Sequence, residues 1–61
     1  MTYAERLYES WPPRDVAEVE SRLPGATRDV VNRVLWRAHD EYERGGRWWV
    51  ALAHAVSKEA A

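Results

Sequence analysis

The sequence predicts an all-α protein, a small bundle of three to four helices with a middle pair that is like a helix-turn-helix. Apolar residues recur three and four positions apart along most of the chain and do not alternate as strand residues do. The helix-breaking pairs Pro12-Pro13, Pro24-Gly25 and Gly45-Gly46 divide the chain into four segments of helical length. Because the chain has 61 residues and no long linker, we expect residues 1–61 to form one small helical domain.

The first expected helix covers residues 2–11. Thr2 and Glu5 have the spacing of a capping box, in which both side chains satisfy free backbone N–H groups of the first turn. Tyr3, Leu7 and Trp11 then repeat every four residues as an apolar stripe, and the proline pair that follows ends the helix.

The second expected helix covers residues 13–23. Pro13 suits a first helical turn, and Asp15 lies near the positive end of the helix dipole. The apolar residues at helical spacing are Val16, Val19 and Leu23, and the helix stops at the next proline–glycine pair.

The third expected helix begins after Thr27, a typical N-cap residue, and ends at Gly45-Gly46. Its valines favour a strand by propensity, but the segment is too long for a typical strand and its apolar spacing is helical. We expect one apolar face made by Val30, Val31, Val34, Leu35, Ala38 and Tyr42.

The fourth segment, residues 47–61, reads "RWWVALAHAVSKEAA". Residues 47–56 after the glycine pair could form a short strand or a wing-like turn, but the high alanine content favours a helix. Its expected apolar face consists of Trp48, Trp49, Leu52, Ala53 and Val56. Neighbouring residues on a helix are rotated by about 100°, so we expect one of the two tryptophans to face the core and the other to lie at its boundary.

The composition limits both the core and the partners. Four Trp and three Tyr, with no Phe, supply much of the apolar area in a short chain, and the absence of Cys excludes disulfides. A formal net charge of −1 argues against a strongly basic nucleic-acid binder. No segment has the apolar length of a membrane span, and the first residues lack the pattern of a secretory signal, so we expect a cytoplasmic protein that does not bind membranes.

Trp36 stands where helical spacing places polar side chains. It lies nearly opposite the expected valine face, among Asp29, Asn32, Arg33, Asp40 and Glu43. Two interpretations stay open. In the first, Trp36 has no binding role, because another helix covers the indole or because it is an ordinary exposed aromatic residue. In the second, Trp36 anchors an interface, where Trp and Arg are enriched.

The second and third segments, joined by "LPGAT", have the outline of a helix-turn-helix. The pair resembles the general class of small regulators that use this motif, including the winged-helix variants. That resemblance implies that the outer face of the third helix contacts DNA. From Arg22 to Arg37, four arginines stand against one aspartate, so this stretch is basic. Acidic residues Asp40, Glu41 and Glu43 follow, and a phosphate backbone would repel them unless they point away.

Two functional hypotheses follow, and neither is enzymatic; the spacing of the motif favours the first, which is the primary hypothesis, and the net charge favours the second. In the first, the chain is a DNA-binding regulator that acts as a homodimer, because one short module buries too little area to be specific. In the second, it is an adaptor or inhibitor that binds a protein through the same Arg/Trp face. The residues assigned to nucleic-acid or partner binding are Arg28, Asn32, Arg33, Trp36 and Arg37.

Catalysis and metal binding find little support in the sequence. His39 and His54 are far apart, and "HDEYE" lacks the second histidine of a zinc-protease motif. His39 and Glu43 are one helical turn apart, but two ligands do not complete a metal site. We therefore expect no catalytic residue, no metal, no cofactor and no small-molecule substrate, and we expect His54 to be a surface residue.

Overall fold

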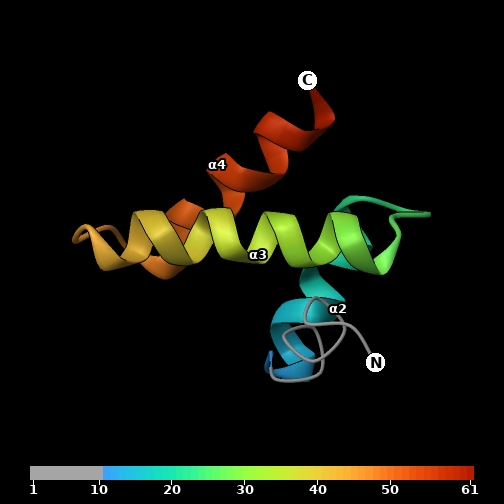
Figure 1. Cartoon of the computed structure of the whole chain (residues 1–61), viewed down its shortest axis with the longest axis horizontal. Helices are drawn as coiled ribbons and strands as arrows, with labels where there is room; N and C mark the ends of the chain where they lie inside the picture. Colours follow the sequence, from blue (N-terminus) through green and yellow to red (C-terminus); the bar gives the residue numbers. More distant parts are fainter. Residues whose placement is uncertain (1–10) are drawn as a thin grey trace.

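The computed structural model describes residues 11–61, which form three α-helices and, within this range, no strand. The helices are α2 (Pro13–Arg22), α3 (Arg28–Glu43) and α4 (Trp48–Ala60). Helix α3 runs along the longest axis of the molecule, α4 crosses it obliquely, and α2 extends from it in another direction (Figure 1). The predicted all-α class is confirmed. The helix expected at residues 2–11 lies outside the described residues except for Trp11, which is not helical.

The helix ends lie where the turn-forming residues predict them. Pro13 occupies the first turn of α2, and the hydroxyl of Thr27 accepts a hydrogen bond from the Val30 backbone N–H at 3.3 Å. Gly25 and Gly45 adopt φ values of +82° and +104°, a region that residues with a Cβ atom rarely occupy. These local signals set the two short connections that fold α2 and α4 back onto α3.

The core is built around the valine-rich face of α3. Its fully buried residues are Val19 from α2, Val31, Val34, Leu35 and Ala38 from α3, and Ala51, Leu52 and Ala55 from α4. The expected face of α3 is thus confirmed at its centre, and Val30 packs against it while only partly buried. Tyr42 was expected in this face but is 50% exposed, because it lies in the last turn of α3 at the edge of the bundle, where its ring meets that of Trp48.

Helix α4 confirms the helical interpretation of residues 48–56 over the strand or wing. Its buried face is centred on Ala51, Leu52 and Ala55, so small side chains face α3. The predicted face was rotated too far toward Trp49, which is 49% exposed, whereas Trp48 packs against the core. The expected division between the two adjacent tryptophans is therefore confirmed.

Candidate functional site

Trp36 lies on the side of α3 that faces away from the buried valines. Its side chain is 39% exposed, in agreement with the expected outward position. The indole is not isolated, because its ring meets Trp11 edge to face at a centroid distance of 5.1 Å and meets His39 in the same way at 5.5 Å. Trp11 and His39 also contact each other at 6.0 Å. We call Trp11, Trp36 and His39 the aromatic cluster.

Asn32 holds the aromatic cluster against α3. Its side-chain oxygen accepts a hydrogen bond of 2.9 Å from the indole Nε1–H of Trp11, in a partly buried position. This bond fixes the segment before α2 beside the middle of α3, so both elements contribute to one surface. It also directs toward Trp11 the oxygen that an asparagine uses as acceptor in paired hydrogen bonds to adenine.

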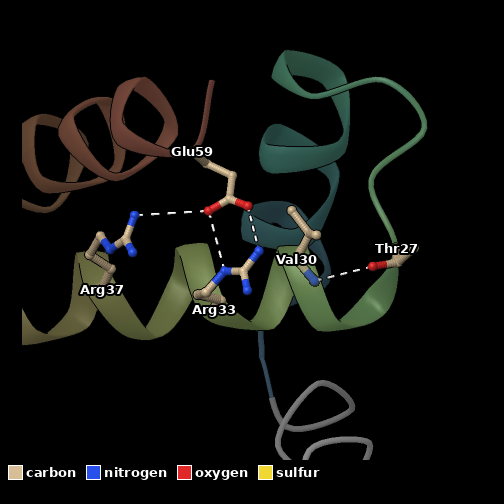
Figure 2. A network of polar contacts seen from close by, with 5 residues as sticks. All are labelled: Thr27, Val30, Arg33, Arg37 and Glu59. Carbon is tan, nitrogen blue, oxygen red and sulfur yellow. Dashed lines mark hydrogen bonds and ion pairs between the residues drawn. The ribbon is translucent and has the colours of Figure 1, made fainter. Parts of the chain in front are cut away.

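Arg33 and Arg37 point toward the end of α4 and share the carboxylate of Glu59 (Figure 2). Arg33 pairs with both oxygens of Glu59, at 2.5 Å and 3.3 Å, and Arg37 lies 3.9 Å from one of them. The hydrogen bond from Arg33 lowers the pKa of Glu59, and the same bond raises the pKa of Arg33. These contacts hold the last turn of α4 over one flank of α3.

Four of the five residues assigned from the sequence thus lie on two different sides of α3, and the fifth lies at its first turn. Asn32 and Trp36 lie toward Trp11, whereas Arg33 and Arg37 lie toward Glu59. Arg28 is exposed at the first residue of the helix. The ring of Trp36 is therefore bordered by two sets of polar side chains that already have partners within the chain.

Next to the aromatic cluster is a groove of about 290 Å³ that the sequence analysis did not predict. It is lined by Trp11, Pro12, Asp15, His39, Tyr42 and Trp48. Trp48 donates its indole N–H to Asp15 at 3.2 Å, and the rings of Tyr42 and Trp48 meet edge to face at 5.9 Å. The one feature of the sequence that could have indicated this groove is the position of Trp11, Tyr42 and Trp48 beside the proline and glycine turns, where helix ends come together.

Both histidines of the described residues lie beside a glutamate. His39 lies 3.3 Å from Glu43, and the exposed His54 lies 3.0 Å from Glu41. Among residues 11–61, no group of three metal-ligating side chains comes together, and no helix is long and apolar enough to cross a bilayer.

Comparison of the chain with models of protein families, with curated proteins and with solved structures finds no match.

Proposed function

We propose that the chain is a non-enzymatic binding module that contacts a partner protein through the aromatic cluster and its arginine border. The observation that carries this proposal is the position of Trp36, a large ring on the face of α3 opposite the core and still 39% exposed. A tryptophan in such a place adds little to a core that Leu35 and its neighbours already fill. Its exposed area is available to a partner.

The surroundings of Trp36 favour a protein surface as the partner. Binding hot spots are enriched in Trp and Arg, and they gain most when a rigid ring is held before the partner arrives. The hydrogen bond between Trp11 and Asn32 holds the cluster in place, and Glu59 orients Arg33 and Arg37. The partner would meet an ordered surface with an apolar centre and a charged edge, as is typical of protein interfaces.

The same contacts weaken the case for DNA. Asn32 has its acceptor oxygen engaged with Trp11, and the two arginines share a carboxylate that a phosphate would have to displace. The net charge of −1 adds no general attraction to a polyanion.

A DNA-binding regulator, the primary hypothesis from the sequence, is kept as the second candidate because of one structural observation. Helices α2 and α3 follow each other through a five-residue connection, Leu23–Thr27, and the N-terminal half of α3 carries the exposed Arg28 together with Arg33, which is 55% exposed. This is the half of the helix that the motif presents to the major groove.

The proposal is tested by capture from a lysate of the source organism with three immobilised proteins: the wild type, Trp36→Ala and Trp49→Ala. Trp49 is the matched control, because it is also half exposed but lies on α4 and contacts Arg14 rather than the cluster. We expect one protein that the wild type and Trp49→Ala retain equally. With this partner purified, Trp36→Ala should weaken binding about 30-fold, as the loss of a hot spot does. If no captured protein depends on Trp36, the proposal is wrong.

The regulator is tested by the salt dependence of binding to random duplex DNA. Contacts between arginines and phosphates predict an affinity that falls steeply as salt rises, with a shallower slope for Arg33→Gln. Absence of binding at low salt would exclude the regulator.

A further inference from the structure

The groove beside the aromatic cluster is lined by four rings, those of Trp11, His39, Tyr42 and Trp48, and by one carboxylate, that of Asp15. The rings of Tyr42 and Trp48 are 81° apart, so two of its walls are nearly perpendicular. Trp11 and His39 form another edge-to-face pair at 61°. Asp15 lies among these rings in a partly buried position.

Both indole donors of the groove are directed into the protein. Trp48 donates to Asp15, and Trp11 donates to Asn32. A bound group therefore finds both indole N–H donors already engaged, which disfavours anions and carbonyl-rich ligands. The negative face of an aromatic ring instead attracts a cation.

Asp15 adds a negative charge that no cation of the described residues neutralises by an ion pair. The neighbouring Arg14 lies over the ring of Trp49, 5.7 Å from its centroid. The Nε2 atom of His39 faces Glu43. The groove thus has a charge that is complementary to a positively charged guest.

We propose that this groove binds a quaternary ammonium group, carried by a trimethylated lysine side chain of the partner protein. The inference rests on the proposed function, since it names a chemical group that the partner presents beside the Trp36 contact. A quaternary ammonium needs no hydrogen-bond acceptor and is attracted to ring faces. A guanidinium or a primary ammonium carries several N–H donors, and of the described residues that line the groove Asp15 alone has a carboxylate to accept from them.

The test is an NMR titration of the whole chain with a short peptide of neutral residues around one trimethyllysine. The indole N–H signals of Trp11 and Trp48 should move, and the methyl protons of the peptide should shift upfield because they lie over ring faces. A peptide with a tert-butyl group in place of the trimethylammonium has the same shape without the charge and should bind about tenfold more weakly.

The variants Asp15→Asn and Tyr42→Leu should each weaken binding of the trimethyllysine peptide about tenfold. Asp15→Asn keeps an oxygen that can accept from Trp48, so it removes the charge with little change of shape. The control Asp29→Asn removes a carboxylate from the exposed side of α3, away from the groove, and should leave binding unchanged.

Three results would overturn the inference. Equal binding of the neutral peptide would show that the groove takes apolar groups without regard to charge. Tighter binding of choline than of the peptide would assign the groove to a free small molecule. Absence of binding at millimolar concentrations of the peptide would show that the groove does not bind a quaternary ammonium group. Each of these outcomes leaves the Trp36-dependent capture unaffected, so the two proposals fail separately.

Discussion

Leu35 and Trp36 are neighbours in sequence whose side chains lie on different sides of α3, and replacing each with alanine separates core from contact surface. Leu35 is fully buried, so Leu35→Ala removes packed methyl groups and leaves a cavity. We expect a loss of about 3–4 kcal/mol in the free energy of unfolding. That is a large part of the roughly 3–9 kcal/mol expected for a chain of this length.

Trp36→Ala should cost less, about 1–3 kcal/mol, because each of two edge-to-face aromatic pairs contributes about 0.5–1.5 kcal/mol and truncation of an exposed ring leaves no buried cavity. The ring has two such contacts, with Trp11 and His39, and much of its remaining surface faces solvent.

Urea unfolding followed by circular dichroism measures both variants against the wild type. With a slope near 1 kcal/mol per molar urea, the midpoint should fall by about 3–4 M for Leu35→Ala and by about 1–3 M for Trp36→Ala. If Leu35→Ala is unfolded in buffer, adding trimethylamine N-oxide restores a transition that can be measured. Equal losses for the two variants would show that Trp36 belongs to the core and not to a contact surface.

Three further perturbations test the local physics. Gly45→Ala should destabilise the fold by about 1–2 kcal/mol in thermal unfolding, because φ is +104° there although nothing lies within 4 Å of an added Cβ; an unchanged melting temperature would contradict the positive φ. Thr27→Ala should lower the free energy of unfolding by about 1 kcal/mol through loss of the hydrogen bond from Val30, whereas Thr27→Ser, which keeps the hydroxyl, should unfold like the wild type. If Thr27→Ser is as unstable as Thr27→Ala, the hydroxyl does not act as a cap. The bond from Arg33 lowers the pKa of Glu59 below its ordinary value of 4.5, so its stabilising effect is present above that pH and is lost as pH falls through the lowered pKa; the difference in melting temperature between wild type and Glu59→Gln should disappear in acid, and a difference that persists at pH 2 would contradict this pairing.

Local chemistry in the sequence predicted the helix boundaries and the centre of the core. Thr27 begins a helix because its hydroxyl accepts from a backbone N–H that has no partner in the first turn, and Pro13 suits a first turn because it has no N–H to leave unpaired. Gly45 permits the turn after α3 because it adopts a positive φ. The spacing of Val31 and Leu35 predicted their burial, because residues four positions apart lie on the same face of a helix.

What the sequence could not provide was the rotation of α4 and the contacts between distant residues. The burial of Ala51 and Ala55 in place of Trp49 depends on how closely α4 approaches α3, which no single segment determines. Likewise, Asn32 meets a tryptophan 21 residues away, and Arg33 meets a glutamate 26 residues away. Such pairs decide which polar groups of α3 stay available, and hence which partner its outer face can bind.

Hydroxyl-radical footprinting with mass spectrometry measures directly whether the indole of Trp36 is offered to a partner. In the free protein, we predict modification of Trp36 at a rate close to that of the half-exposed Trp49 and above that of the partly buried Trp48. On addition of the captured partner, the rate at Trp36 should fall while the rate at Trp49 stays the same. Protection of Trp36 in the free protein to the level of Trp48, or its unchanged modification in the complex, would contradict a contact surface centred on this residue.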